Sequence, residues 1–188
     1  PASGIRSFAG CLYNVASGGG SFAVHSGTTA SGTNSTALGR VTVASDYAST
    51  VIGQYNSSGS SATSANSFST SAPAFVIGNG TSGSLSDAFK VMFNGDATVS
   101  NDLTVSGDVV ISSDARLKSN IVSLGSTLPK LLQIDGKSYE MKGKQKIGVL
   151  AQEIKEVFPE LVSEDDNEML AVNYQGLVPV LINALKEQ

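Results

Sequence analysis

Ser113 and Lys118, five positions apart, have the chemistry needed to break a peptide bond. A serine hydroxyl is a weak nucleophile until a base accepts its proton. A lysine amine can be that base when desolvation lowers its pKa enough to leave it neutral near pH 7. The spacing therefore makes these two residues a candidate catalytic dyad.

The same residues also have an ordinary structural interpretation. A Ser-Asp pair ahead of an amphipathic segment, here Ser113-Asp114, often starts a helix because its side chains accept hydrogen bonds from free backbone N–H groups. A lysine shortly afterwards is unremarkable. Spacing alone leaves both interpretations open, so the elements that would position the pair must be considered.

The chain after residue 113 has the patterns of a small α+β unit. Ala151, Ile154 and Val157 fall on one face of a predicted helix. Phe158 lies beside that face, and Pro159 stops the helix.

A second helix is predicted near the C-terminus. Its apolar face is broad: Tyr174, Leu177, Val178, Val180, Leu181, Ala184 and Leu185. Pro179 either kinks this helix or marks its start. Residues 139–141 and 146–150 are predicted as short strands.

The part before residue 114 contains 24 Ser and 15 Gly, a composition typical of disordered chains and also of repetitive β-structures. A 14-residue repeat favours β-structure, since residues 21–25 align with 35–39 and then with 49–53. Each copy provides two short strands, and only stacked copies can bury their apolar residues. Residues 21–62 resemble the head repeats of trimeric autotransporter adhesins, which form parallel β-rolls packed as trimers.

A second repeat, six residues long, spans 95–112. Asx and Gly at the start of each unit provide turns, and the third and fifth positions are apolar. These apolar positions are Ala97, Val99, Leu103, Val105, Val109 and Ile111. Three identical chains wound around one axis could bury them together, which predicts an intertwined β stalk; a two-sheet monomer is the alternative.

Residues 57–71 are Ser-rich and are predicted as a loop. Residues 75–80 are predicted as a strand that enters an Asn-Gly turn. Phe89, Val91 and Phe93 then alternate toward a core, which predicts a hairpin-like segment between the two repeats.

Charge and composition narrow the function classes. The net charge is −4, without the clustered Lys and Arg of a nucleic-acid-binding patch, and no apolar run approaches the length of a membrane helix. Cys11, the only cysteine, is expected to be a small buried residue. His25 replaces a Gly of the other repeats and is expected to be a surface variant, not a metal ligand.

Four segments after residue 112 together resemble the intramolecular chaperone auto-processing domain of phage tail fibres and tailspikes. They are residues 113–121, 148–154, 158–162 and 172–174, in the family's order. The resemblance covers 114–188. The family includes phage endosialidases, L-shaped tail fibres and neck appendage proteins, and an animal membrane-bound transcription factor shares the domain.

The resemblance implies that the domain folds as a trimer, helps the upstream fibre to trimerise, and then cuts itself off. It assigns the cleavage dyad to Ser113 and Lys118 and the cleavage site to the Ser113–Asp114 bond. Attack by Ser113 on its own carbonyl would close a strained four-membered ring, whereas attack on the carbonyl of Ser112 closes a five-membered ring. Cleavage before or after Ser113 therefore stays open at this point.

Two further residue groups are considered for a role in the site. Gln152 and Glu153 either support the dyad or cap a helix and bind backbone. The acidic run of Glu164, Asp165 and Asp166 is expected to be a solvated loop, not a metal site.

The predicted fold is a mainly β, intertwined homotrimeric fibre of β-roll repeats and a β stalk, followed by a small α+β chaperone domain. The expected domains are a β-roll segment at 1–71, a stalk at 72–113 and the chaperone domain at 114–188. The function expected is the tip of a phage tail fibre, a virion protein assembled in the host cytoplasm, with a chaperone that removes itself. The expected partners are two further copies and a host receptor, possibly a glycan; no cofactor, metal, nucleic acid or membrane insertion is expected. The alternative is a structural or adhesive trimer that does not cleave.

Overall fold

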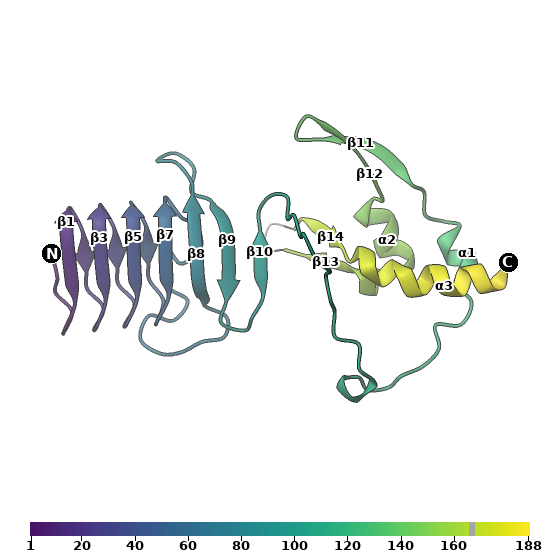
Figure 1. Cartoon of the computed structure of the whole chain (residues 1–188), viewed down its shortest axis with the longest axis horizontal. Helices are drawn as coiled ribbons and strands as arrows, with labels where there is room; N and C mark the ends of the chain where they lie inside the picture. Colours follow the sequence, from purple (N-terminus) through teal and green to yellow (C-terminus); the bar gives the residue numbers. More distant parts are fainter. Residues whose placement is uncertain (166–167) are drawn as a thin grey trace. The chain divides into compact units, whose positions relative to one another are not determined.

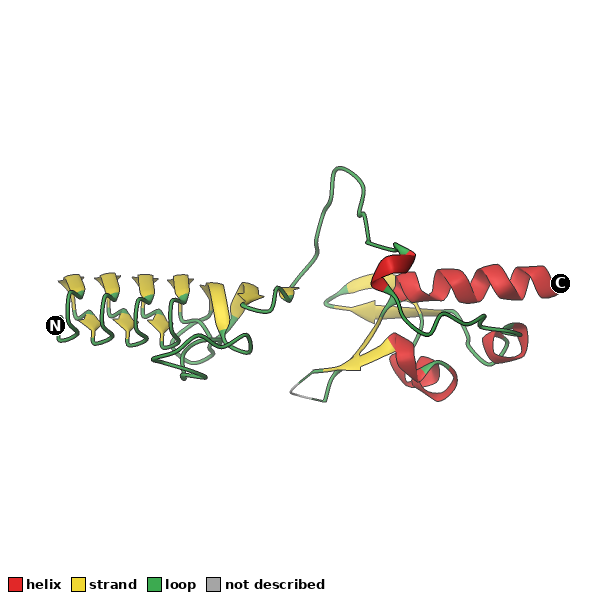
Figure 2. Cartoon of the chain, turned by 90° about the horizontal axis from the view of Figure 1, so that it is seen from below, coloured by secondary structure: helices red, strands yellow, loops and turns green. Residues whose placement is uncertain are grey.

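In the computed structural model of the chain, the 14-residue repeats form parallel strands, one long and one short in each repeat (Figure 1). The long strands are β1 (Phe8–Leu12), β3 (Phe22–Ser26), β5 (Thr36–Arg40) and β7 (Thr50–Gln54), and the short ones are β2 (Val15–Ala16), β4 (Thr29–Ala30) and β6 (Val43–Ala44). Long strands pair with long and short with short, always 14 residues apart, as Phe22 pairs with Thr36. The result is a β-solenoid of about three turns with two facing sheets, visible as two rows of strands in Figure 2.

The solenoid begins one turn earlier than the sequence repeat predicted. The first recognised copy began at Ser21, whereas β1 and β2 already form a turn, with Phe8 paired to Phe22. The missed signal is Ser7-Phe8-Ala9, which repeats as Ser21-Phe22-Ala23.

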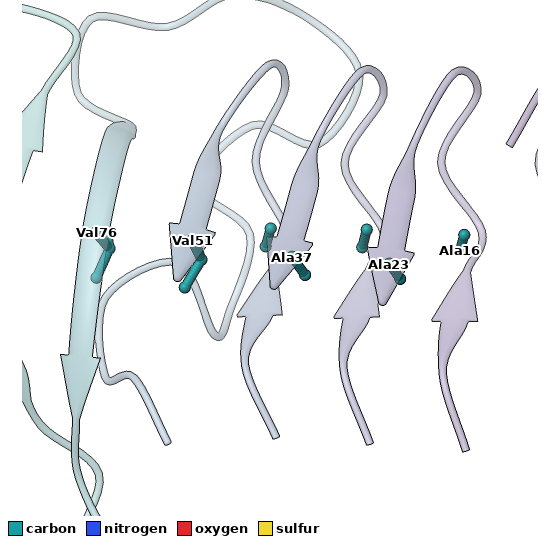
Figure 3. Packing of buried hydrophobic residues seen from close by; sticks show 7 residues of the cluster. Ala16, Ala23, Ala37, Val51 and Val76 are labelled. Atoms are coloured by element: carbon teal, nitrogen blue, oxygen red, sulfur yellow. The ribbon is translucent and has the colours of Figure 1, made fainter. Parts of the chain in front are cut away.

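The core between the two sheets is built from very small residues (Figure 3). The completely buried apolar residues of this cluster are Ala16, Ala23, Ala30, Ala37, Ala44, Val51 and Val76. An alanine removes little apolar surface from water, so each turn gains little by itself. Stability must therefore come from stacking one turn on the next.

A column of buried polar residues runs beside this core at the same 14-residue spacing: Asn14, Thr28, Thr42 and Asn56. Asn14 Oδ1 accepts hydrogen bonds from the Thr28 backbone N–H and hydroxyl, both at 2.8 Å. At the other end, Asn56 Oδ1 accepts from the Val43 N–H at 2.8 Å. These bonds satisfy backbone groups that the turns between strands leave unpaired.

Three positions in each turn have a left-handed backbone, and one of them lies within the long strand. The position within the strand is occupied by Cys11 (φ 70°), His25 (φ 87°), Gly39 (φ 117°) and Gly53 (φ 94°). The prediction that Cys11 is buried is wrong: its side chain is exposed, although the residue lies within strand β1. His25 is exposed, which confirms it as a surface variant of the Gly position.

The C-terminal end of the solenoid is closed by the loop 57–71, which contains no strand, as predicted. Asp46 lies buried at the last short turn, and its Oδ1 accepts hydrogen bonds from the N–H groups of Thr63 and Ser64 at 2.6 Å. The loop therefore takes the place of a fourth short strand.

The long sheet then continues beyond the solenoid. β8 (Pro73–Asn79) adds in parallel to β7, β9 (Asp87–Met92) pairs antiparallel to β8, and β10 (Ala97–Val99) pairs antiparallel to β9, completing seven strands. The predicted strand and hairpin-like segment are confirmed, but Phe89 and Val91 do not point toward the solenoid core as predicted, because the buried Val76 pairs with Lys90 between them. Their connection is longer than an Asn-Gly turn, since residues 80–86 separate the two strands.

Of the six-residue repeats, only the first forms a strand, β10. Residues 100–113 contain no strand, and the apolar positions Leu103, Val105, Val109 and Ile111 are exposed. The three-chain stalk stays a prediction.

The structure describes residues 1–165 and 168–188 and divides into two compact units, Pro1–Val109 and Val110–Gln188. The second unit holds, in chain order, η1 (Ala115–Leu117), α1 (Leu128–Leu131), β11 (Lys137–Met141), β12 (Lys144–Gly148), α2 (Ala151–Val157), η2 (Pro159–Leu161), β13 (Val162–Glu164), β14 (Leu170–Val172), η3 (Tyr174–Gly176) and α3 (Leu177–Glu187). Two antiparallel hairpins, β11–β12 and β13–β14, accompany the helices. The predicted α+β character, both strands and the end of α2 before Pro159 are confirmed.

The core of this second unit consists of Ile154, Phe158 and Val180, surrounded by partly buried apolar residues of α1, α2, β13, β14 and α3. The predicted apolar face of α3 is only partly buried within the single chain. Val180 and Ala184 are its buried residues, whereas Leu181 and Leu185 are exposed. Pro179 stands in the first turn of α3, where its missing N–H costs nothing, so it marks the start of the helix.

Glu164 ends strand β13, so it does not belong to a loop as predicted. Asp165 is exposed, and Asp166 lies outside the described residues. Within 1–165 and 168–188, no helix is long and apolar enough to cross a membrane, and no three metal-binding side chains cluster.

Candidate functional site

The structure brings the two predicted dyad residues into direct contact. Lys118 Nζ donates a hydrogen bond to Ser113 Oγ over 2.8 Å. A proton can pass directly between nucleophile and base at this separation once the amine is neutral. The contact has the geometry that serine activation by lysine requires.

The one-turn helix η1 between the two residues produces this contact. Asp114 caps it by accepting a hydrogen bond from the Arg116 N–H at 2.8 Å, and the Lys118 N–H closes the turn on the Ala115 carbonyl at 3.1 Å. Lys118 then leaves the helix in extended conformation. The helix-start interpretation is thus correct for Asp114, while the Ser113 hydroxyl is left to contact the lysine.

Arg116 was not singled out from the sequence, although it holds Asp114 in place. Its Nε lies 3.1 and 3.2 Å from the two carboxylate oxygens, and its Nη2 lies 2.7 Å from Oδ2. The side-chain and backbone hydrogen bonds from Arg116 lower the pKa of Asp114. The Asp-x-Arg spacing is the signal that could have identified this fork.

The dyad is open to solvent in the single chain. Every residue from Val109 to Lys118 is exposed, including both dyad members. Solvent stabilises the charged form of an amine, and desolvation is what a lysine base needs. The geometry of the pair is present in one chain, while the dry environment is not.

Gln152 and Glu153, the predicted supporting residues, occupy the first turn of α2. Glu153 contacts Lys137 at 3.3 Å and the Asp135 N–H at 3.4 Å, which ties α2 to the start of β11. Gln152 is exposed at the edge of an apolar pocket that includes Tyr139. These contacts fit the structural interpretation for Glu153, and a supporting role for either residue stays a prediction.

Segments that are separate in the sequence meet around Tyr174. Its hydroxyl accepts a hydrogen bond from the Val149 N–H at 3.2 Å. Gly148 lies so close that a Cβ there would be 2.6 Å from the Tyr174 hydroxyl and 3.1 Å from that of Tyr139. The Asn173 N–H also bonds the Leu161 carbonyl at 2.8 Å. The last three of the four sequence signatures are therefore joined by backbone hydrogen bonds and contacts around Tyr174.

The segment after the dyad is fastened to α3 through Glu187. Its carboxylate accepts hydrogen bonds from the Ser126 hydroxyl at 2.7 Å and the Thr127 N–H at 2.6 Å. These bonds lower the pKa of Glu187. The Thr127 hydroxyl also donates to the Val180 carbonyl at 2.8 Å. The chain downstream of the dyad is thus anchored on the C-terminal helix, a link with no sequence signal because 60 residues separate its partners.

A serine–lysine pair on a short capped turn, followed by a small α+β unit, defines a candidate self-processing domain at the end of a β-solenoid. Residues 113–163 match the model of a peptidase family described as the chaperone of endosialidase. The C-terminal unit therefore carries a chaperone domain of the endosialidase type, as the resemblance predicted. This match points to a chaperone role of the kind found in phage tail fibres, with a peptidase-like domain. No match was found among curated proteins.

Proposed function

We propose that this chain is the tip of a phage tail fibre or tailspike whose C-terminal domain drives homotrimerisation and then releases itself by autoproteolysis next to Ser113. The observation that carries the proposal is the 2.8 Å contact between Lys118 Nζ and Ser113 Oγ. The family match begins at residue 113, the nucleophile itself. The site of action is then the virion fibre, and its external partner a host receptor, for which surface glycans are the proposed class.

The proposed chemistry consumes one water and needs no cofactor. Neutral Lys118 takes the proton of the Ser113 hydroxyl, and Oγ attacks the Ser112 carbonyl carbon through a five-membered ring. The Ser112–Ser113 C–N bond breaks as the nitrogen accepts a proton, which leaves an ester between the Ser112 carbonyl and Oγ. Water then hydrolyses that ester. The family's expected cut, Ser113–Asp114, is the competing outcome, and the fragment masses separate the two.

Assembly of three chains would supply the dry environment that the dyad lacks in a single chain. Both dyad residues are exposed in the single chain, where water surrounds the pair. Packing of three chains would remove water from the pair and favour the neutral amine. Cleavage would then follow correct trimer formation, and a monomeric form should cut itself much more slowly.

The homotrimer is supported by apolar surface that the single chain leaves uncovered. Leu103 is 70% exposed in the six-residue repeats, and Leu185 is 72% exposed on α3. Both belong to regularly spaced apolar sets, which three identical chains can bury around a common axis.

A denaturing gel of the purified chain tests the proposal. The 19.2 kDa chain should give two smaller bands, whereas Ser113→Ala and Lys118→Arg should each give one intact band. Lys118→Arg is the sharper variant because arginine keeps the charge and can donate to Ser113 but does not deprotonate in proteins. Ser112→Ala and Lys186→Ala are the matched controls and should cleave normally.

Cleavage in both dyad variants would show that the assignment is wrong. An intact wild-type band in a chain that light scattering shows to be trimeric would instead favour the alternative function, a non-cleaving structural or adhesive trimer. Intact mass measurement of the released fragment identifies the bond that is cut.

A further inference from the structure

The long sheet of the solenoid extends two strands beyond its apolar core, as Figure 1 shows for β9 and β10. One row of cross-strand partners runs along its inner side through Ala37, Val51 and Val76, and continues as Lys90 on β9 and Thr98 on β10. Partners directly opposite one another lie on the same face of a sheet. Val76 is completely buried, whereas Lys90 is half-buried and Thr98 is exposed. The inner side of the sheet therefore changes from apolar to polar beyond β8.

A hollow of about 390 Å³ opens at this polar end of the sheet, and we call it the polar pocket. Its volume is within the range of small-molecule binding sites. The walls come from β9 and β10, from the loop after β7 and from the connection between β8 and β9. The lining residues include Ser57, Asn79, Leu85, Asp87, Lys90 and Thr98.

Three hydrogen-bonding groups of the polar pocket have no donor contact within the part of the chain that the structure describes. They are Lys90 Nζ, Asn79 Nδ2 and the Thr98 hydroxyl. Acceptors are present beside them. Asp87 accepts one backbone N–H of the loop on each carboxylate oxygen, both at 2.9 Å, and each oxygen has a further lone pair. A bound polar molecule can satisfy such a set of donors and acceptors.

The chemistry of the lining points to an uncharged, hydroxyl-rich ligand. Lys90 and Asp87 are the ionisable lining residues, so their charges balance and attract neither an anion nor a cation strongly. A hydroxyl group donates and accepts hydrogen bonds, which matches a lining of mixed donors and acceptors. Leu85 is 53% exposed at the same pocket and offers apolar surface to the C–H face of a sugar ring.

We infer that the polar pocket binds a neutral sugar unit of a host surface glycan. The inference deepens the proposed function, on whose receptor class it rests, by naming the site and the charge of the sugar. The pocket lies within the first compact unit, Pro1–Val109. It would therefore stay with the fibre after the proposed self-cleavage.

Glycan binding by the full chain tests the inference. The probe is an array of bacterial surface oligosaccharides, in which each neutral glycan is printed beside an analogue with one hydroxymethyl group oxidised to a carboxylate. The strongest neutral ligand is then titrated by calorimetry at low and at high salt. Neutral glycans should bind at least as strongly as their acidic analogues. Their affinity should change less than about twofold with salt, since screening acts on charges.

Substitutions in the polar pocket locate the bound sugar. Lys90→Met keeps an unbranched side chain and removes the charge, so it should weaken binding about tenfold or more. Thr98→Val removes only the hydroxyl and should weaken binding about fivefold. Arg6→Met is the matched control, because it removes one positive charge from an exposed turn outside the pocket and should bind like the parent. Each variant must give the circular dichroism of the parent, and Lys90→Gln replaces Lys90→Met if the latter does not.

The possible failures are distinguishable from one another. If glycans bind but the Lys90 and Thr98 variants bind them like the parent, the polar pocket is not the site, and the proposed receptor class stands. Binding of acidic glycans alone, or an affinity that falls steeply with salt, would also overturn the inference. A chain that binds no glycan would overturn both the inference and the receptor class, while two bands on the denaturing gel would still support self-cleavage.

Discussion

The two units of this chain build their cores from different materials. In the solenoid the fully buried apolar residues are alanines and two valines, and the backbones of successive turns lie almost in contact. In the C-terminal unit the core residues are Ile154, Phe158 and Val180. The solenoid is thus specified by backbone geometry repeated every 14 residues, and the C-terminal unit by the volume of a few side chains. Adding a methyl group to the solenoid should therefore lower its stability. Removing methyl groups from the core of the C-terminal unit should lower the stability of that unit.

The units also resemble each other in one respect, which is the amount of apolar surface each leaves uncovered. Phe8 and Leu12 are more than half exposed in the solenoid, and Ile147 and Val122 are more than four fifths exposed in the C-terminal unit. Scattered exposed residues are normal, but regularly spaced ones mark interaction surfaces. The proposed homotrimer would cover apolar surface of both units despite their different cores.

The largest effect should come from adding one methyl group to the solenoid backbone. A Cβ at Gly39 would lie 2.0 Å from the Gly53 carbonyl oxygen, in a backbone with φ 117°. Gly39→Ala should destabilise the solenoid by about 4 kcal/mol or more. Hydrogen exchange measured by mass spectrometry should show lost protection in β3 to β8 and unchanged protection in α2 and α3.

Gly107→Ala is the matched control, because no atom lies within 4 Å of a Cβ built there. It should leave the exchange pattern unchanged. Equal loss of protection in both units after Gly39→Ala would show that they do not unfold separately and would break the comparison.

The second effect concerns side-chain volume in the C-terminal unit. Ile154 is completely buried between α2 and its neighbours, so Ile154→Ala should cost about 3 kcal/mol through lost burial and the cavity left behind. Denaturant titration followed by exchange should show α2 and α3 opening first, with the solenoid unaffected. Ile147→Ala removes the same atoms from a side chain that is 86% exposed and should change stability by less than about 0.5 kcal/mol. Similar costs for the two isoleucines would contradict the assigned core.

The smallest effect is electrostatic and depends on pH. Hydrogen bonds from Ser126 and Thr127 hold the pKa of Glu187 below its ordinary 4.5. A carboxylate with a lowered folded pKa stabilises the fold above the unfolded value, and this contribution is lost as pH falls through the folded value. Glu187→Gln should therefore lower the melting temperature at pH 7, and the difference should vanish at about pH 2. Glu156→Gln, on the exposed side of α2, is the control; a Glu187→Gln deficit that persists in acid would rule out the charge as its cause.

Much of the fold could be predicted because the chain repeats itself. The 14-residue period gave the pairing of long and short strands directly, since stacked turns must place equivalent residues side by side. The first turn escaped notice because its Gly10 and Cys11 obscure the match to Val24 and His25. Cys11 was misplaced for a related reason: small size favours burial, but this position of β1 has a left-handed backbone and its side chain is exposed.

The two dyad residues could be predicted from the sequence. The residues that hold the surrounding chain in place were harder to predict. Ser113 and Lys118 stood out through their motif, and five residues are few enough for one helical turn to join them. The fork of Arg116 on Asp114 is also local and was within reach of the sequence. Glu187 was not, because nothing in a sequence tells which distant carboxylate will cap a given turn. The buried side of α3 was misjudged because seven apolar residues in one helix leave several faces equally plausible.

The repeating turn of the solenoid has a consequence for how the length of the solenoid can change in evolution. Each 14-residue unit adds one strand to the long sheet, and strands stand about 4.8 Å apart. Duplication or loss of one unit in the gene would therefore lengthen or shorten the solenoid in steps of about 4.8 Å. The contacts between neighbouring units would be the same as before. The number of units can therefore vary without a change in the structure of each unit.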